Sequence, residues 1–437
     1  MTVRRTLVIL GALGILTLPG AAVADSVTDM NITTTQAIAA AVPPRAGAAI
    51  PLDYAVVHTA IHDAVQAFEH RYQPYAINLS ATSGSVDAAV AKAAHDVLVN
   101  RFPAQAAGFL DPAYNAYLVA HNIAPNDPGV AVGAQAAAAV IALRSTDGSY
   151  PNPSPVFIGS TDVGMWRPTP SFLPGPPPSF ASMAVPWYAT VTPFTLTGPS
   201  QFRPATPPGA TSGLYTKDYK EIKRLGSDVN SERTPEQTYV ATFWAMNFGV
   251  QWNVAARDIV AAHVSSIGDS ARLFALVNMA MADAAIGAWD CKVTYPFWRP
   301  ITAIQEGDND GNKHTEGDVN WRPFINTPNY PDPCSGANGV SAAASKVFAL
   351  VLGTDHFSFV MTSNNPAAVP PTHTYTRFSD ASRDVRDARV YQGIHFRFAD
   401  VAGRKIGLAV AKQAFHNVLR PVGGGEDEGD NDDGDDD

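Results

Sequence analysis

The sequence has little of the charge and the strand patterning that several protein classes need. Only 16% of the 437 residues are charged, and 30 Lys and Arg against 40 Asp and Glu give a formal net charge of −10. No segment carries a basic stripe, so we exclude nucleic acid as a partner. Alternation of polar and apolar residues is scarce, which argues against an all-β fold.

Long apolar runs are lacking outside the N-terminus. Arg4 and Arg5 precede a short apolar core from Leu7 to Leu18, and Ala22-Val-Ala24 fits a cleavage site. This pattern predicts a signal peptide over residues 1–24, because the core is too short to span a bilayer. No other run reaches the roughly 18 apolar residues that a span needs. We therefore expect a secreted or periplasmic protein with no membrane contact after cleavage.

Helical patterning is abundant, and it predicts an all-α fold. Apolar spacing, alanine content and a Thr-Pro-Glu-Gln start signal indicate helices. We expect them at Asp53–Phe68, Val86–Val99, Val130–Leu143, from Thr234 toward Gly249, and at Ala271–Trp289, Val340–Leu352 and Asp387–Leu419. We expect one domain over residues 25–420, a large helical bundle with long Pro-rich loops.

Two segments depart from the helical pattern. Residues 147–208 are rich in Pro, Ser, Thr and Gly, and we expect an irregular excursion that packs over the helices through Trp166, Phe172 and Trp187 and forms one wall of the site entrance. Residues 421–437 carry nine acidic residues and no Lys or Arg. Such a tail cannot bury apolar surface and is predicted to be disordered.

Three short blocks concentrate residues suited to an oxyanion. Lys292 stands seven positions before Arg299, Ser335-Gly336 follows Cys334, and Arg389 stands six before His395. Guanidinium forks match phosphate-like oxygens and a lysine adds a point charge. The helix expected after Ser335 adds backbone N–H groups at its N-terminus. We expect Lys292 and Arg299 just after the Ala271–Trp289 helix, and a bend or helix start near Gly393 that lets Arg389 and His395 converge.

These blocks resemble the vanadium-dependent haloperoxidases and the phosphatidic-acid phosphatase type-2 superfamily. The family pattern is Lys-x6-Arg-Pro, then Ser-Gly-His, then Ser-Arg and Arg-x5-His. Here it reads Lys292 to Arg299-Pro300, Ser335-Gly336-Ala337, Ser382-Arg383, and Arg389 to His395. The middle block departs from the family, because Ala337 stands where the family has its acid–base histidine.

The resemblance implies a haloperoxidase of the bundle fold that uses vanadate as cofactor. His395 would bind the vanadium, as the one metal-ligating residue, with Lys292, Arg299, Ser335, Gly336 and Arg389 around its oxygens. Lys292, Arg299, Arg389 and His395 would be the catalytic residues, and peroxide and halide the substrates. Two alternatives stay open: an acid phosphatase in which His395 attacks a phosphate ester, and an inactive phosphate- or vanadate-binding protein. His373 and His314 are candidates to replace the missing histidine.

The two cysteines flank the site blocks. Cys291 precedes Lys292 and Cys334 precedes Ser335. An exported chain with an even cysteine count favours a disulfide. We predict a Cys291–Cys334 bond, with two buried thiols as the alternative.

Two other patterns invite a functional interpretation that we do not favour. His58 and His62 lie one helical turn apart, but no third ligand block completes a metal site, so we expect packed, hydrogen-bonded histidines. Trp-Arg-Pro occurs at 166, 298 and 321, and only Arg299 follows a lysine at the required spacing. We expect Arg167 and Arg322 to be structural.

Overall fold

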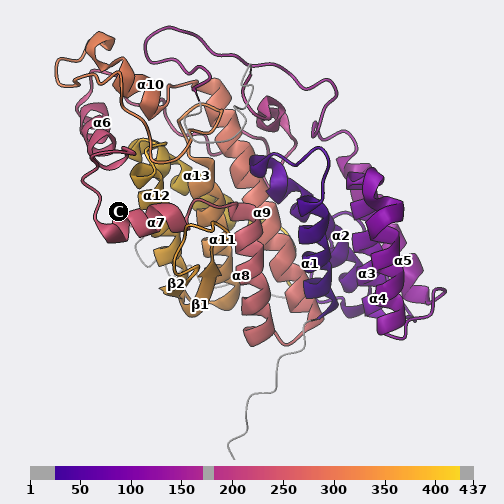
Figure 1. Ribbon diagram of the computed structural model, residues 1–437. Helices are drawn as coiled ribbons and strands as arrows, with labels where there is room; N and C mark the ends of the chain where they lie inside the picture. Colours follow the sequence, from indigo (N-terminus) through magenta and orange to yellow (C-terminus); the bar gives the residue numbers. More distant parts are fainter. Residues whose placement is uncertain (1–24, 171–181, 424–437) are drawn as a thin grey trace, which may run out of the picture.

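The computed structural model describes residues 25–170 and 182–423, and it confirms an all-α architecture (Figure 1). Over these residues the chain folds into thirteen α-helices and a single two-stranded hairpin. The predicted signal peptide, Phe172 and residues 424–437 of the acidic tail lie outside the described residues.

The elements follow one another along the chain as follows. The α-helices are α1 (Ser26–Ala39), α2 (Ile50–Glu69), α3 (Val86–Arg101), α4 (Asp111–Ala120), α5 (Pro128–Arg144), α6 (Gly213–Leu225), α7 (Pro235–Phe243), α8 (Phe248–His263), α9 (Ile267–Thr294), α10 (Pro300–Gln305), α11 (Gly336–Leu352), α12 (Phe378–Tyr391) and α13 (Arg397–Asn417). The strands are β1 (His356–Thr362) and β2 (Thr372–Arg377). Short 3-10 turns occur at Gly47–Ala49, Pro103–Gln105, Pro186–Thr190 and Gly307–Asn309, and a π-turn at Ala106–Leu110.

Helix α9 forms the centre of the molecule. It packs against α2 on one side and against α11 and α13 on the other, and Figure 1 shows it running through the middle of the fold. Its length and apolar composition would suit a membrane span, but that apolar stretch is entirely buried by the other helices. Its hydrophobicity is therefore that of a central core helix.

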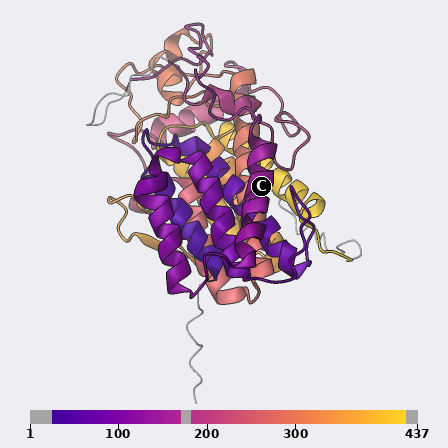
Figure 2. The same cartoon turned by 90° about the vertical axis from the view of Figure 1, so that its right-hand side faces the viewer.

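The N-terminal helices form a layer on one side of α9. Alanine-rich α3 packs closely on α5 and on α2, because small side chains let helix backbones approach. Figure 2 views the molecule from this side, with the purple helices in front of the orange and yellow C-terminal elements. The C-terminal elements α9 to α13 carry the predicted oxyanion residues.

Two predicted helices are wrong in their extent. The helix that starts with the Thr234 capping box ends at Phe243, and α8 then begins with its own N-cap, Asn247, whose side chain accepts from Val250 N. The segment predicted as one helix over 387–419 is two helices. The break lies at Gly393, whose φ is +78° and whose Cα approaches the Gly226 carbonyl so closely that a Cβ would lie 2.2 Å from it. The bend predicted near Gly393 is therefore confirmed.

The hairpin of β1 and β2 was not predicted. The strands pair antiparallel, with Phe359 opposite Tyr375. Phe359 and Tyr375 are buried against Phe378 and Trp244. The hairpin thus packs over the start of α12 and over α8, and its pattern is weak in the sequence because only a few of its side chains are buried.

The described part of the Pro-rich excursion packs over the helices, as predicted. Trp166 and Trp187 are buried. The Asp283 carboxylate on α9 accepts hydrogen bonds from the backbone N–H groups of Phe194 and Thr195, both at 2.7 Å. Arg203 pairs with Asp290 near the end of the same helix at 2.6 Å. Buried hydrogen bonds, rather than regular secondary structure, fix this segment.

His58 and His62 are packed core residues, as predicted. The His58 ring stacks on Phe274 with centroids 4.9 Å apart, and its Nε2 accepts from Asn31 Nδ2 at 2.8 Å. His62 Nε2 donates to the Gln73 carbonyl at 3.1 Å. Within residues 25–170 and 182–423 no group of three or more metal-ligating side chains occurs.

Burial makes these two histidines a source of acid sensitivity. It lowers the pKa of His58 to about 3 and that of His62 to about 4. Both are neutral in the folded protein but become charged in the unfolded chain below its pKa of about 6.5. Their contribution to stability is therefore complete above pH 6.5 and is lost as the pH falls toward 4. At pH 5 each of the two histidines therefore lowers the free energy of unfolding by about 2 kcal/mol.

The free energy of unfolding should fall between pH 7.5 and pH 5 in both proteins. We expect the fall to be about 2 kcal/mol smaller in His62→Gln than in the unchanged protein. A glutamine amide can still donate to the Gln73 carbonyl but does not titrate. Urea unfolding at the two pH values measures the difference. His314→Gln, at an exposed position, is the control and should behave as the unchanged protein. Equal losses in all three proteins would show that His62 does not couple folding to pH.

Candidate functional site

Lys292 lies inside the last turns of α9 and not after the helix, because α9 continues to Thr294. Its side chain is fully buried. Nζ donates to the carbonyls of Pro331, Asp332 and Pro333 at 2.7, 3.2 and 3.3 Å. The ammonium group therefore holds in place the segment that leads to Ser335.

Arg299 is the N-cap residue of α10 and is also fully buried. Its Nε donates to the Tyr330 carbonyl at 2.7 Å and its Nη1 to the Ile394 carbonyl at 2.5 Å. These two bonds connect the segment before Ser335 to the segment before His395. Nη1 lies 3.1 Å from His395 Nε2 and 3.3 Å from Nδ1, so the predicted meeting of Arg299 and His395 is confirmed.

Arg389 and His395 reach the site from either side of the break at Gly393. Arg389 is on the last turn of α12, and His395 lies just before α13. Both are buried, and Arg389 Nη1 donates to Gln392 Oε1 at 2.6 Å. An unbroken helix would point residues six positions apart in different directions.

Ser335 and Gly336 form the N-terminus of α11. Ser335 is the N-cap and its backbone N–H donates to the Ala399 carbonyl at 2.9 Å. Its hydroxyl accepts from Asn338 Nδ2 at 3.1 Å. Gly336 is packed against Trp289, where a Cβ would lie 2.9 Å from the indole ring. The helix start is thus held tightly beside the end of α9.

We call Lys292, Arg299, Ser335, Gly336, Arg389 and His395 the anion cluster. All six residues are buried, and the charges of Arg299 and Arg389 add to the lowering of the Lys292 pKa, as the charge of Arg299 does for the Arg389 pKa. Burial is the largest cause for each of these cations. It also lowers the pKa of His395 well below its usual range, with the three cations adding to the effect. The imidazole is therefore neutral.

Two buried carboxyl groups belong to the site and were missed in the sequence. Asp332 Oδ1 lies 3.0 Å from His395 Nδ1 and 3.8 Å from Arg299 Nη1. Asp400 Oδ1 accepts from Asn338 Nδ2 at 2.8 Å. Burial raises the pKa of Asp332 to about 7 and that of Asp400 well above its usual range. Their position inside the motif blocks, three residues before Ser335 and five after His395, is the signal that could have found them.

The arrangement suits a bound anion. Three cations are buried beside two carboxyl groups. Because burial disfavours the ionisation of these carboxyl groups, they do not fully compensate the positive charge. Within the described part of the chain, Arg299 Nη2 and Arg389 Nε are buried donors without a hydrogen-bond partner. The Oδ1 of Asp332 can accept from His395 Nδ1–H whether or not the carboxyl group is ionised, and this tautomer leaves the lone pair on Nε2. The cluster can therefore hold an oxyanion and present one imidazole nitrogen to it.

The structure does not bring His373 or His314 to the anion cluster. His373 lies in β2, where its ring packs near Tyr239, Phe243 and Tyr375. His314 is exposed on a loop. Over residues 25–170 and 182–423, no hydrogen bond or ring contact joins either histidine to the cluster.

Other arginines of the motif blocks are structural. Arg167 pairs with Glu306, and Arg322 pairs with Asp228 at 3.1 Å, so the prediction for these two Trp-Arg-Pro arginines is confirmed. Arg383 pairs with Asp380 on the exposed face of α12.

The predicted Cys291–Cys334 disulfide is present. It closes a sequence separation of 43 residues and joins the end of α9 to the residue before Ser335. Cys334 has a φ of +57°, a left-handed conformation that non-glycine residues rarely adopt. The disulfide thus helps to hold this backbone beside Lys292.

We expect the double variant Cys291→Ala with Cys334→Ala to lose about 2–4 kcal/mol of free energy of unfolding. We also expect weaker phosphate binding, because the covalent link between the residues next to Lys292 and Ser335 is lost. Urea unfolding and calorimetric titration with phosphate measure the two effects. The unchanged protein in its reduced form should match the variant. Full retention of both stability and affinity would show that the bond does not organise the site.

Comparison with protein families identifies the part of the chain that carries the anion cluster. Residues 272–424 match the family model described as the VCPO second helical-bundle domain. Vanadium chloroperoxidase from Curvularia inaequalis is 28% identical over 186 residues, which are 36% of this chain and 30% of that protein. The chain therefore spans less than a third of the length of this relative.

Solved structures share the fold over nearly the whole chain. A bacterial vanadium-dependent iodoperoxidase superposes with a TM-score of 0.73 at 24% identity, covering 90% of this chain and 95% of the other. A holo-type bacterial vanadium-dependent chloroperoxidase superposes with a TM-score of 0.67 at 16% identity, covering 91% and 93%. These structures show that the chain has the fold of the bacterial vanadium-dependent haloperoxidases, and the family match over residues 272–424 agrees with it.

Proposed function

We propose that this chain, which has the fold of the vanadium haloperoxidases and matches their second helical-bundle domain over residues 272–424, binds vanadate and oxidises halide with hydrogen peroxide. The observation that carries the proposal is the anion cluster. Three buried cations surround a neutral imidazole, and two of their nitrogen donors lack partners in the described structure.

The residues present fit a vanadate group. His395 Nε2 is the nitrogen available to the metal, because Nδ1 faces Asp332 at 3.0 Å. Arg299 Nη2 and Arg389 Nε are free to donate to the oxygens. The Ser335 hydroxyl and the N-terminus of α11 add hydrogen-bond donors. When bound, vanadate supplies the centre at which peroxide is activated to oxidise a halide.

The protein contributes charge, orientation and exclusion of water. Arg299 and Arg389 act as fixed positive charges in a buried site, where electrostatic stabilisation is strongest. Lys292 adds its charge while Nζ holds the segment from Pro331 to Pro333. Asp332 is a positioning residue, since its bond to Nδ1 fixes the ring orientation and the tautomer of His395.

One observation favours a phosphatase as the second candidate. A carboxylate at Nδ1 makes the opposite imidazole nitrogen a better nucleophile, as attack on a phosphate ester requires. Ala337 favours the third candidate, an inactive oxyanion-binding protein, because a methyl group cannot transfer a proton. We also propose a secreted or periplasmic location, which the disulfide supports because such bonds persist in oxidising compartments.

A single set of assays separates these candidates. The purified protein is loaded with orthovanadate and given hydrogen peroxide, bromide or iodide, and a phenol-based dye. We expect halogenation of the dye that depends on both vanadate and peroxide. Hydrolysis of an aryl phosphate that vanadate inhibits would instead select the phosphatase. A higher melting temperature with phosphate or vanadate, without turnover in either assay, would select the binding protein.

A further inference from the structure

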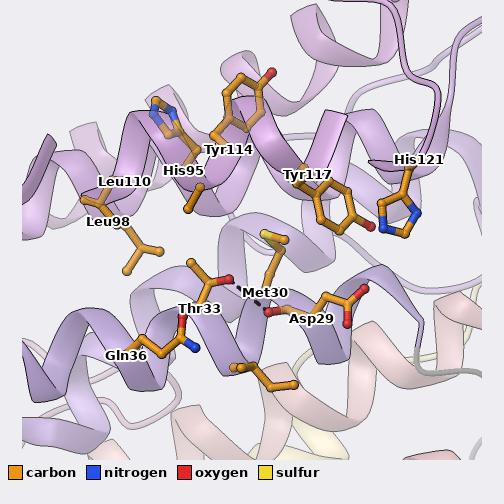
Figure 3. Close-up of a pocket in the computed structure, with 13 residues that line it drawn as sticks. Asp29, Met30, Thr33, Gln36, His95, Leu98, Leu110, Tyr114, Tyr117 and His121 are labelled. Carbon is orange, nitrogen blue, oxygen red and sulfur yellow. Dashed lines mark hydrogen bonds between the residues drawn. The ribbon is translucent and has the colours of Figure 1, made fainter. Parts of the chain in front are cut away.

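A second cavity lies in the N-terminal layer, away from the anion cluster. It is lined mainly by α1, α3 and α4 and has a volume of about 330 Å³, within the range of small-molecule sites. Figure 3 shows α4 above the cavity and α1 below it. The residues of the anion cluster come from α9 to α13 and the segments between them, and none of them lines this cavity.

One part of the cavity wall is apolar. Met30 on α1, Leu98 on α3, and Leu110 just before α4 are buried and line it, together with Ile32. These side chains offer no hydrogen bond, so they suit the hydrocarbon part of a ligand. A site with an apolar wall and a few polar groups at one end selects an amphipathic molecule.

The other end is formed by a carboxylate and two stacked rings. The rings of Tyr117 and His121 have centroids 4.1 Å apart. Figure 3 shows Asp29 directed toward both of them from α1. In the described structure the Asp29 carboxylate has no hydrogen-bond or salt-bridge partner, and the buried Tyr117 Oη lies near the Ser26 hydroxyl.

The charges around this end are negative. Asp25 and Asp87 act on both Asp29 and Tyr117, and His121 is the group that acts on the Asp29 pKa in the opposite direction. Burial is the main cause that raises the pKa of Asp29. Asp25 has a structural task, since it caps α1 through Thr28 N at 2.9 Å, whereas the Asp29 carboxylate makes no such bond.

The remaining titratable groups are paired with one another. His95 bonds to Asp96 and Asp111, both at 2.8 Å, and Lys92 pairs with Asp96. None of these groups neutralises Asp29, so this end of the cavity keeps an excess of negative charge. Aromatic faces beside a carboxylate are the groups that hold ammonium ions.

We propose that this cavity binds an organic cation with an apolar body, its ammonium group held between Asp29 and the Tyr117–His121 ring pair. The apolar body lies against Met30 and Leu98. The site is independent of the proposed oxyanion chemistry, because no residue is shared between them.

Calorimetric titration of the full chain at pH 7 with 4-phenylbutylamine and 4-phenylbutan-1-ol tests the proposal. The two probes have the same apolar body and differ in charge. We expect the amine to bind at least about tenfold more tightly, since a partly buried ion pair and a cation–π contact favour only the cation. Equal affinities, or no binding of the amine, would overturn the proposal.

Matched variants locate the ammonium group. Asp29→Asn should weaken amine binding about tenfold, while Asp258→Asn, which removes the same charge from an exposed position on α8, should not change it. Tyr117→Phe keeps the aromatic face and should bind as the unchanged protein, whereas Tyr117→Leu should bind several-fold more weakly. Unaltered binding by Asp29→Asn would refute the assignment. His395→Ala should leave amine binding intact, so failure of the oxyanion proposal would not affect this one.

Discussion

Replacing His395 with alanine is expected to reduce halide oxidation by the vanadate-loaded protein by at least about a thousandfold. His395 supplies the one imidazole of the anion cluster, and a methyl group cannot ligate a metal. Removing a residue that bonds directly to the reacting centre costs more than removing a neighbour that only orients it. Initial rates of dye bromination, measured at saturating vanadate, give the size of the loss.

The control for this variant is a histidine outside the cluster. His314→Ala changes an exposed loop residue and should keep the full rate. Circular dichroism and the melting temperature should show that both variants are folded. A His395→Ala protein that brominates as fast as the unchanged protein would contradict the assignment of His395, whatever its stability.

Introducing a histidine at Ala337 is expected to raise the turnover rate by about a hundredfold or more. Ala337 is half-buried in the first turn of α11, directly after Ser335 and Gly336. General acid–base assistance is typically worth about 10²–10⁴ in rate, and both His373 and His314 lie away from the anion cluster. The measurement is kcat for bromination by Ala337→His as a function of pH.

A variant of similar size separates proton transfer from packing. Ala337→Gln adds a polar side chain that does not titrate in the working pH range and should give no gain. The gain in Ala337→His should disappear at low pH, where the new imidazole is protonated throughout the cycle. An unchanged rate in Ala337→His would show that another group already transfers the proton. Asp332 would then be the first candidate, because it lies 3.0 Å from His395.

Much of the site could be predicted because its residues recur at fixed spacing. Lys292 and Arg299 stand on either side of the end of α9, and Arg389 and His395 on either side of Gly393. Each spacing reflects a helix end that turns two side chains toward one point. The cysteines were informative for the same reason, since each adjoins a residue of the cluster.

Asp332 and Asp400 were missed because burial is not visible in a sequence. Acidic residues in a loop, such as Asp332, or on a helix, such as Asp400, ordinarily face water, yet both carboxyl groups are completely buried here. Their raised pKa values are consequences of that enclosure. The same limit explains the helix boundaries, because the break after Phe243 depends on tertiary packing that periodicity does not report.

The hairpin of β1 and β2 was missed for a related reason. Each strand buries only a few side chains, so the alternation that marks a strand is short. Strands of this kind are stabilised by the helices they cover, and propensity alone does not identify them.

A crystal structure of the protein soaked with orthovanadate tests the central claim most directly. The account predicts vanadium bonded to His395 Nε2, with its oxygens contacted by Arg299 Nη2, Arg389 Nε and the N-terminus of α11. Vanadate bound at another place would contradict the account. So would the absence of density between Arg299 and His395 after a soak at saturating vanadate.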